Sequence, residues 1–253
     1  MGNINPEWYK YWSLDIKDQS WVEDTENQVD FIIKVLELTG KERILDLACG
    51  FGRHSLAFAR RGFSVVGVDI TKDFIDDAIK EAKSASLSVD FILSDIRVLA
   101  FKSEFDVVLN LADGAIGYLE NEEENLKIFD VVTNALKPGG KHFMDICNAE
   151  HAEHFFPKRY WDIGTTTLSL PSFDWDKQNR RMLFGDWTIT FGEVVNRPDS
   201  IEPFSSTRLY SLRELEAILQ QRDMKIVRSF SDYYGKEASY KELQLMVFSQ
   251  KNY

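Results

Sequence analysis

A pair of glycines beside an acidic residue forms the first candidate ligand site in this sequence. Residues 43–54 read RILDLACGFGRH, an apolar run that breaks into small residues before a helical pattern begins. Residues 43–48 are apolar enough for a buried parallel strand, and Gly50 and Gly52 would let the backbone approach a ligand closely. A helix starting at Arg53 would direct its N-terminus toward that ligand. The pattern indicates a nucleotide-type ligand.

The same residues argue against a dinucleotide. A dinucleotide fingerprint needs G-x-G-x-x-G, and Ser55 stands where the third glycine should be. Asp46 argues in the same direction, because its carboxylate would repel a pyrophosphate but favour a ligand with an amine or sulfonium charge. A cationic adenosine ligand fits better, so an NAD-dependent oxidoreductase is a disfavoured alternative.

Two further acids follow the next apolar runs. Asp69 closes the run 63–68, 17 positions after the second glycine, where an acid can hold a ribose diol. Asp95 follows the run 89–93 and could accept the exocyclic amine of adenine, while Ile96 could pack on its ring. A single Asp at a strand end is more often a turn or helix cap. The ordered set of three acids is much more specific than any one of them.

With these motifs the chain resembles the class I S-adenosylmethionine-dependent methyltransferases of the small-molecule type. The likeness covers residues 43–147 and is carried by four stretches: Asp46 to Gly52, Gly67-Val68-Asp69, Ser94-Asp95-Ile96 and Leu136 to Gly140. The resemblance implies S-adenosyl-L-methionine as methyl donor and S-adenosyl-L-homocysteine as product. Ala48 stands where many members have glycine, which exchanges one small residue for another.

The resemblance also implies roles for individual residues. It places Asp46 near the methionine amine, the glycine loop along the amino-acid and sulfonium end, Asp69 on the ribose and Asp95 on adenine. With the neighbours of these acids and one residue of an N-terminal lid, the predicted cofactor-binding set is Tyr11, Asp46, Ala48, Gly50, Gly52, Asp69, Ile70, Asp95, Ile96 and Leu111.

The elements that must position these residues alternate along the chain. Strands are predicted at about 43–48, 64–68, 89–94, 105–111, 141–147, 224–231 and 243–249, and helices at about 25–38, 53–61, 72–85, 122–136 and 211–222. Ser211 and Glu214 form a predicted capping box, and Leu136 to Gly140 predicts a chain reversal. We therefore predict an α/β fold with a doubly wound, seven-stranded, mostly parallel sheet. By resemblance, its last strand is antiparallel.

Residues 151–207 interrupt this alternation. Three segments, 165–170, 181–191 and 204–210, are rich in Thr, aromatic and branched residues, and a polar turn lies at 176–179. We expect a small antiparallel β insertion after strand 5. By resemblance it would cover the acceptor, and a dimer interface is the alternative. The predicted organisation is an aromatic lid segment at 1–24, a Rossmann-like donor-binding domain at 25–150 and 208–253, and the inserted substrate subdomain at 151–207.

The first 24 residues are unusually aromatic, with Trp8, Tyr9, Tyr11, Trp12 and Trp21. Ring faces attract a cationic methylsulfonium, and closure over it would exclude water from the transfer. Tyr11 is the predicted lid contact. The alternative is that these rings simply pack on the core.

Methyl transfer from a sulfonium is a direct displacement, so the protein must mainly align the acceptor, and a base is needed only for a protonated acceptor. Asn110 and Tyr118 lie in the loop after the fourth strand and are predicted to position the acceptor, followed by Trp161 and Arg208 in the insertion. His151 and His154 also follow a strand, but they fit a solvated helix start. The sequence identifies no catalytic residue.

Composition limits the partners. The chain has 253 residues, 44% of them hydrophobic, and no apolar stretch as long as a membrane span or a signal core. Its two cysteines show no metal spacing, which favours a reduced, cytoplasmic setting without a metal. With 30 basic and 41 acidic residues, the formal charge of -11 opposes binding to nucleic acid.

The sequence therefore predicts a methyltransferase that moves the methyl group of S-adenosylmethionine to nitrogen or oxygen of a small-molecule acceptor. We expect a monomer or homodimer with neither nucleic acid nor membrane as partner. Two alternatives stay open: a noncatalytic adenosyl-ligand-binding partner or sensor protein, and a protein methyltransferase.

Overall fold

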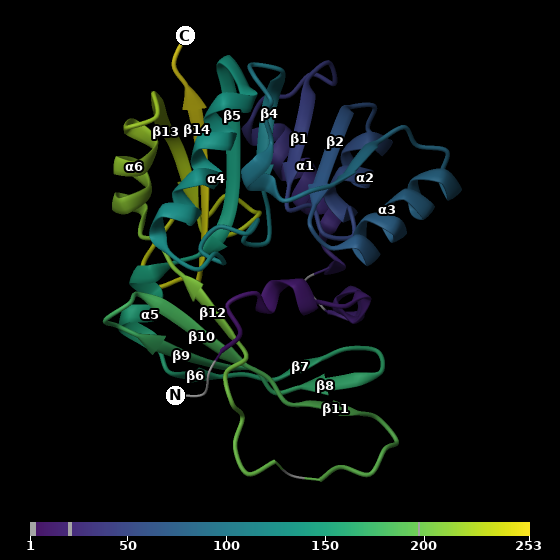
Figure 1. Cartoon of the computed structure of the whole chain (residues 1–253), viewed down its shortest axis with the longest axis vertical. Coiled ribbons are helices and arrows are strands. Elements are labelled where there is room, and N and C mark those ends of the chain that lie inside the picture. The colour runs from purple at the N-terminus through teal and green to yellow at the C-terminus, as the bar shows by residue number, and fades with distance from the viewer. Residues whose placement is uncertain (1–3, 20–21, 197) are drawn as a thin grey trace.

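A seven-stranded sheet forms the centre of the computed structural model, which describes residues 4–19, 22–196 and 198–253 (Figure 1). Its strands follow the order β13 (Met224–Phe230), β14 (Gln244–Lys251), β5 (Leu136–Cys147), β4 (Phe105–Asn110), β1 (Arg43–Leu47), β2 (Ser64–Asp69) and β3 (Asp90–Leu93). β14 pairs antiparallel with both β13 and β5, and the other neighbouring strands pair in parallel. The predicted doubly wound sheet with an antiparallel last strand is confirmed.

Helices cover both faces of this sheet because its strands are apolar on both sides. Ile44 of β1 packs in one core cluster with α1 (Thr25–Val35) and α2 (Arg53–Arg60). Its neighbour Leu45 points the other way and packs in the cluster of α4 (Glu122–Ala135) and α6 (Leu212–Gln220). Adjacent residues of a strand face opposite sides of the sheet, so a buried strand needs apolar residues at every position.

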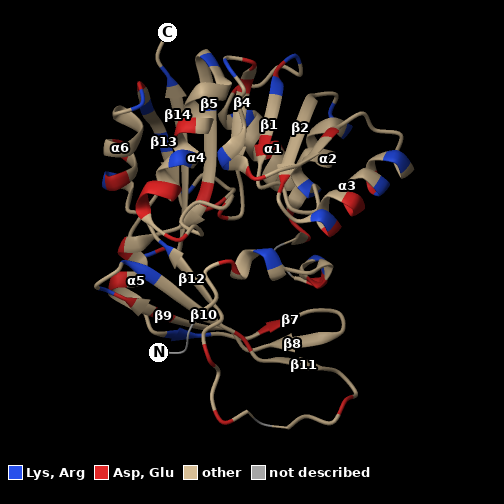
Figure 2. Cartoon of the chain, in the orientation of Figure 1, with Lys and Arg blue, Asp and Glu red and all other residues tan. Residues whose placement is uncertain are grey.

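The local sequence sets the start of one helix, and packing on the sheet buries the apolar residues of another. Ser211 caps α6, since its hydroxyl accepts the N–H of Glu214 while the Glu214 carboxylate accepts the N–H of Ser211, which confirms the predicted capping box. α3 (Lys72–Ser84) packs against β2 and β3 and buries Phe74 and Ala78. Figure 2 shows Lys and Arg interspersed with Asp and Glu along this helix.

The segment Leu136–Gly140, which was predicted to reverse the chain, belongs to the first, irregular part of β5, directly after α4 ends at Ala135. Phe105 pairs with Leu136, and the register then shifts before the regular pairing continues. Gly139 has a φ of 73° within the irregular stretch, a conformation that glycine adopts without strain.

The inserted region contains two small antiparallel sheets rather than one. The first has the order β12 (Ser205–Arg208), β10 (Arg181–Gly185), β9 (Ser172–Asp176) and β6 (Lys158–Arg159), and the second has β11 (Thr188–Thr190), β8 (Thr167–Ser169) and β7 (Asp162–Ile163). The expected strand 181–191 is divided between them. At Gly185 a Cβ would come within 2.7 Å of the Glu202 carbonyl oxygen, so another chain segment crosses closely where the two strands separate.

The N-terminal segment lies between the large sheet and the small sheets (Figure 1). It forms two short 3-10 helices, η1 (Trp8–Tyr11) and η2 (Leu14–Asp18). Trp21 lies outside the described residues. A further helix, α5 (Ala149–Phe155), follows β5, and its Ala149 and Ala152 pack with Met182 of β10. This packing fixes the four-stranded sheet beside the carboxyl end of β5.

In the part of the chain that the structure describes, no helix combines the length and the apolar character needed to cross a bilayer.

Candidate active site

A cavity of about 640 Å³ lies at the carboxyl ends of β1, β2, β4 and β5. Three parts of the chain form its wall: the loops after these strands, the N-terminal segment with Trp8 and Trp12, and the four-stranded sheet with Phe173 and Phe184. Open α/β sheets bind ligands at this edge, and small-molecule sites usually measure roughly 300–1,000 Å³. We take this cavity as the candidate active site.

The loop after β1 brings backbone to the cavity wall. Ala48 and Gly50 line the cavity, and both have positive φ angles, 55° and 56°. Gly52 has a different role, because a Cβ there would come within 2.8 Å of the Phe91 ring and 2.9 Å of Ala78. Its lack of a side chain lets α2 begin directly against β3 and α3, and it is not among the cavity-lining residues.

Asp46 and Asp69 both reach the cavity from the ends of β1 and β2. Ser55 donates a hydrogen bond of 2.6 Å to Asp46, and burial raises the pKa of Asp46 to about 6. Asp69 accepts the N–H of Gly50 at 2.9 Å and that of Thr71 at 2.8 Å, and burial raises its pKa as well. Each carboxylate keeps lone pairs for a ligand beyond these bonds.

The structure does not bring the third predicted acid to this wall. Asp95 is held by Arg97, whose guanidinium donates to both carboxylate oxygens at 2.6 to 3.1 Å, and this bonding lowers the pKa of Asp95. Ile96 is buried in the core beside it. Ile70 and Leu111, in contrast, do line the cavity.

Tyr11 was the predicted lid contact, but its neighbours in the N-terminal segment line the cavity instead. Tyr11 is 74% exposed and does not line the cavity, whereas Trp8, Tyr9 and Trp12 do. Tyr11 ends η1 with a largely exposed side chain, although it follows the buried Trp8 by one turn of the 3-10 helix.

Of the four residues predicted to position the acceptor, the structure brings only Tyr118 to the cavity. Asn110 is fully buried and donates to the Gly114 carbonyl at 2.8 Å, while its own oxygen meets His142 at 3.2 Å, so it holds the loop after β4. Trp161 is 70% exposed. Arg208 forms ion pairs with Glu214 and Glu122.

The predicted histidines also lie outside the cavity lining. His151 is buried in α5 and meets the Tyr240 carbonyl and the Lys158 amine, and His154 meets the Glu150 carbonyl one turn earlier. Both are therefore engaged within or beside α5.

Sequence reasoning missed two carboxylates at the ends of β4 and β5, Asp113 and Asp145. Tyr118 donates to Asp113 at 3.1 Å, and the backbone N–H of Cys147 donates to it at 3.2 Å. Burial, followed by the charge of Asp145, raises the pKa of Asp113 to about 6. Asp145 accepts a 2.7 Å hydrogen bond from Tyr233 and another from Gln244, and burial raises its pKa. Both carboxylates line the cavity.

A left-handed turn presents Asp113 to the cavity. Ala112, Asp113, Gly114 and Ala115 all have positive φ angles, between 50° and 69°. This conformation costs about 1–2 kcal/mol for each residue with a side chain, so the surrounding packing must impose it. The loop is anchored at Gly117, whose carbonyl accepts the N–H of Arg208 at 2.8 Å and where a Cβ would meet the Arg208 oxygen at 1.9 Å.

Arg53 is another functional candidate that sequence reasoning missed. It begins α2 and lines the cavity, where its guanidinium donates to Thr25 at 2.7 Å and to Gln28 at 2.8 Å. Burial lowers the pKa of Arg53, although the group stays charged. Its position directly after Gly52 was the available sequence signal. The site therefore contains a cation as well as acids.

Among the described residues, no three His, Cys, Asp or Glu side chains are grouped so that they could hold a metal ion. Cys49 and Cys147 are free thiols that line the cavity, and burial raises the pKa of both well above the ordinary value. Both thiols are therefore protonated at neutral pH.

Comparison with known proteins agrees with this geometry. Residues 44–140 match the family model described as a methyltransferase domain. The putative methyltransferase YqeM of Bacillus subtilis (strain 168) is 28% identical over 221 residues, which are 85% of this chain and 86% of that protein.

Two solved structures share the fold over nearly the whole chain. One is an S-adenosylmethionine-dependent methyltransferase from Clostridium acetobutylicum ATCC 824, with a TM-score of 0.76, 18% identity and coverage of 94% of this chain and 97% of that one. The other is the CcbJ methyltransferase from Streptomyces caelestis, with a TM-score of 0.75, 16% identity and coverage of 90% and 95%.

Proposed function

We propose that the protein methylates nitrogen or oxygen of a small molecule, because residues 44–140 match a methyltransferase domain and the chain shares its fold with an S-adenosylmethionine-dependent methyltransferase. The composition of the cavity wall carries this proposal. The N-terminal segment and the four-stranded sheet both contribute to this wall, and the whole cavity, which would hold donor and acceptor together, measures about 640 Å³, a volume that suits small ligands. In this proposal residues 1–24 form a lid and residues 151–207 cover the acceptor.

The residues of the cavity fit S-adenosylmethionine. Asp69 would hold the ribose diol, and the backbone at Ala48 and Gly50 leaves room for close approach. Asp46 would favour the methionyl ammonium and Arg53 its carboxylate, which matches the zwitterionic end of the donor. When bound, S-adenosylmethionine supplies an electrophilic methyl group on a sulfonium.

The contribution of the protein to such a transfer is alignment and exclusion of water. Trp8 and Trp12 provide ring faces on the lid side of the cavity, which favour positive charge. Phe173 and Phe184 contribute apolar wall from the insertion. Such side chains would keep the acceptor oriented, and closure over the bound ligands would compete with hydrolysis by keeping water out.

The first experiment is calorimetric titration with S-adenosylhomocysteine. We expect micromolar binding to the wild type and roughly 30-fold weaker binding to Asp69→Asn, because a charged hydrogen bond contributes about 2 kcal/mol. The matched control is Asp130→Asn, which removes the same charge from the exposed side of α4. Equal affinity of all three proteins would place the nucleoside elsewhere.

The second experiment separates enzyme from binding protein. The protein is incubated with methyl-labelled S-adenosylmethionine and a cell extract divided into small molecules and proteins. Label in the small-molecule fraction is the expected result. Label in the protein fraction alone would identify a protein methyltransferase, and binding of S-adenosylhomocysteine without any labelled product would identify a noncatalytic sensor or partner protein.

A further inference from the structure

We infer that the acceptor is an amine that enters the cavity as an ammonium ion, and that Asp113 and Tyr118 receive its nitrogen. This inference rests on the proposed methyltransferase function and specifies its substrate class. The observations that carry it are the charge of the cavity, the hydrogen bonding of Asp113 and the aromatic wall opposite the sheet.

The charge of the cavity favours a cation. Its lining includes six carboxylates, from Asp24, Asp46, Asp69, Asp113, Asp145 and Asp232, but among the described residues Arg53 is the only lysine or arginine that lines it. Asp46, Asp69 and Arg53 are already assigned to the donor. The remaining acids at the ends of β4 and β5, Asp113 and Asp145, would repel an anionic acceptor. A neutral hydroxyl would leave their buried negative charge without a compensating positive charge.

Of the two carboxylates at the ends of β4 and β5, Asp113 has the greater capacity for a ligand. Its oxygens accept bonds of 3.1 and 3.2 Å, near the long end of the normal range. Asp145 is held more tightly, by a 2.7 Å bond from Tyr233 and by Gln244. Asp145 therefore acts as a positioning residue behind the site, whereas Asp113 on its left-handed turn can accept N–H groups of a substrate.

The aromatic wall near Asp113 suits the same ligand. The ring centroids of Trp8 and Tyr118 are 4.6 Å apart, and both rings line the cavity. Electron-rich ring faces attract ammonium ions. The indole N–H of Trp8 adds a separate indication, because this residue is 94% buried and its Nε1 has no hydrogen-bond partner among the described residues. A hydrogen-bond acceptor of a bound molecule, other than its ammonium nitrogen, would satisfy this N–H group.

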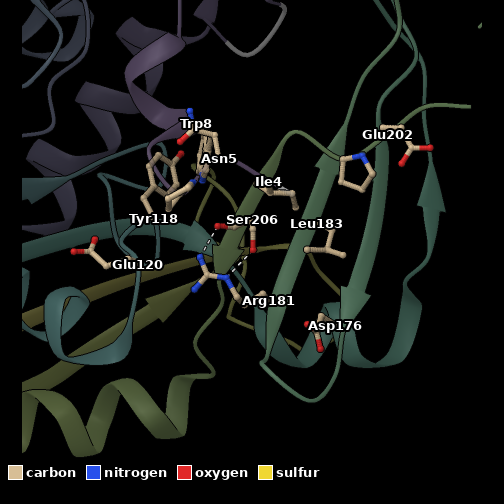
Figure 3. A pocket seen from close by; sticks show the side chains of 12 residues that line it. Ile4, Asn5, Trp8, Tyr118, Glu120, Asp176, Arg181, Leu183, Glu202 and Ser206 are labelled. Carbon is tan, nitrogen blue, oxygen red and sulfur yellow. Dashed lines mark hydrogen bonds between the residues drawn. The ribbon is translucent and has the colours of Figure 1, made fainter. Parts of the chain in front are cut away.

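A second cavity, next to the first, also favours positive charge. It measures about 420 Å³ and is bordered by Trp8 and Tyr118, which also line the first cavity (Figure 3). Among the described residues, three carboxylates line it, from Glu120, Asp176 and Glu202, against the single guanidinium of Arg181. Arg181 is itself bonded to the Ser206 hydroxyl and carbonyl, each at 2.6 Å. The space next to the first cavity is therefore acidic as well.

The chemistry is balanced by one proton for each methyl group. The bound ammonium gives a proton to the Asp113 carboxylate, which leaves a free lone pair on nitrogen. That lone pair forms the new C–N bond while the C–S bond of the donor breaks, and sulfur keeps the electron pair. Asp113 then releases its proton to solvent, so the products are a methylated ammonium, S-adenosylhomocysteine and one proton.

The test divides the small-molecule extract by charge before labelling. Cationic, neutral and anionic pools are each incubated with the protein and methyl-labelled donor, and a further sample of the cationic pool is first treated with acetic anhydride to block its amines. We expect label from the cationic pool only, loss of that label after acetylation, and at least a tenfold lower rate with Asp113→Asn. Asp130→Asn is the charge-matched control and should retain the rate.

A binding measurement accompanies this test. Protein saturated with S-adenosylhomocysteine is titrated with phenethylamine and with its neutral isostere 2-phenylethanol, because the wall is aromatic. We expect the amine to bind at least tenfold more tightly than the alcohol, and this preference to disappear in Asp113→Asn while the affinity for S-adenosylhomocysteine stays within twofold.

Label from the neutral or anionic pool, label that survives acetylation, or an unchanged rate in Asp113→Asn would each overturn the amine assignment. In all three cases labelled product would still support the methyltransferase function. Absence of product from every pool, or failure to bind S-adenosylhomocysteine, would instead contradict the proposed function itself.

Discussion

The proposed donor half of the cavity, at β1 and β2, and the proposed acceptor half, at β4 and β5, both present two carboxylates at strand ends, but they hold them differently. At β1 and β2, the groups bonded to Asp46 and Asp69 lie at most 19 positions away: Ser55 in the next helix, Gly50 in the glycine loop and the N–H of Thr71. At β4 and β5, Asp113 is bonded to Tyr118 five positions on but also to the N–H of Cys147 34 positions on, and Asp145 is bonded to Tyr233 88 positions on. Segments from both chain ends also line the cavity here.

This difference suits the two ligands. A loop built from local contacts forms the same site in any chain with the same motif, which fits a donor common to many methyltransferases. A site built from a strained turn, a lid and an insertion changes whenever any of these changes, so it can be adapted to one acceptor. If the proposed function holds, the general site for the donor and the specific site for the acceptor lie side by side along the edge of the sheet.

The largest expected effect concerns the anchoring of the two halves. Gly117→Ala should cost about 3–4 kcal/mol of unfolding free energy and Gly52→Ala about 2–3, because both add left-handed strain and a clash, against backbone in the first case and side chains in the second. Gly62→Ala, with φ of 89° and nothing within 4 Å, should cost about 1 kcal/mol. Denaturant unfolding measures all three. Equal losses would show that the close contacts carry no energy.

The second largest effect is expected in the pH dependence of phenethylamine binding, which should distinguish the proposed acceptor half from the proposed donor half. The pKa of Asp113 is raised to about 6, so its carboxylate is charged above that pH and neutral below it. Phenethylamine stays protonated between pH 5 and 8, so its affinity should fall as pH drops through 6, by up to about tenfold per unit.

The groups facing Asp113 are Asp145 and Cys147 from β5 and Tyr118 from its own loop. Burial raises the pKa of Cys147 and of Tyr118 far enough that neither changes charge in this range. Asp145 also has a raised pKa and would contribute in the same direction. Calorimetry across this range should therefore give a flatter profile for Asp113→Asn, and a flat profile in the wild type would contradict the assignment.

Removing one hydroxyl should affect only the acceptor half. Tyr118→Phe keeps the ring against Trp8 but loses the bond to Asp113, so binding of phenethylamine should weaken about fivefold to tenfold, or about 1–1.4 kcal/mol. The affinity for S-adenosylhomocysteine should stay within twofold. Tyr240→Phe, on a half-exposed ring outside the cavity lining, is the matched control. A parallel loss of donor affinity would show that the halves are not separate.

The smallest effect is expected at Asp95. Because Arg97 already occupies both of its oxygens and the residue does not line the cavity, Asp95→Asn should weaken S-adenosylhomocysteine binding less than about threefold. Titration beside Asp69→Asn provides the scale. A loss as large as that of Asp69→Asn would show that adenine reaches Asp95 and that the donor site extends past the cavity seen here.

The sequence was informative where contacts are local. The strand before Ala48, the acid closing β2 and the capping box at Ser211 each depend on residues within about ten positions, and the structure has all three. It was less informative where a side chain has two possible environments. Asn110 has the right place in the chain for an acceptor contact, but its buried amide holds Gly114 instead.

The inserted region shows the same limit. Its Thr-rich and aromatic segments indicated strands, but the division of 181–191 between two sheets depends on a crossing near Glu202. The β-strand propensity of a residue reflects how well its side chain fits a pleated surface, and it does not indicate which neighbouring strand the segment will pair with.

By itself, the sequence determined the alternation of strands and helices, the glycine loop and the two acids of the donor half, because hydrophobic period and turn chemistry act over short distances. Only the tertiary structure decided that Asp113 and Asp145 meet, that Trp8 and Tyr118 share a wall, and that Tyr11 and Trp161 face away. Those outcomes depend on packing between segments that lie far apart in the sequence, as Trp8 and Tyr118 do, and no local pattern encodes it.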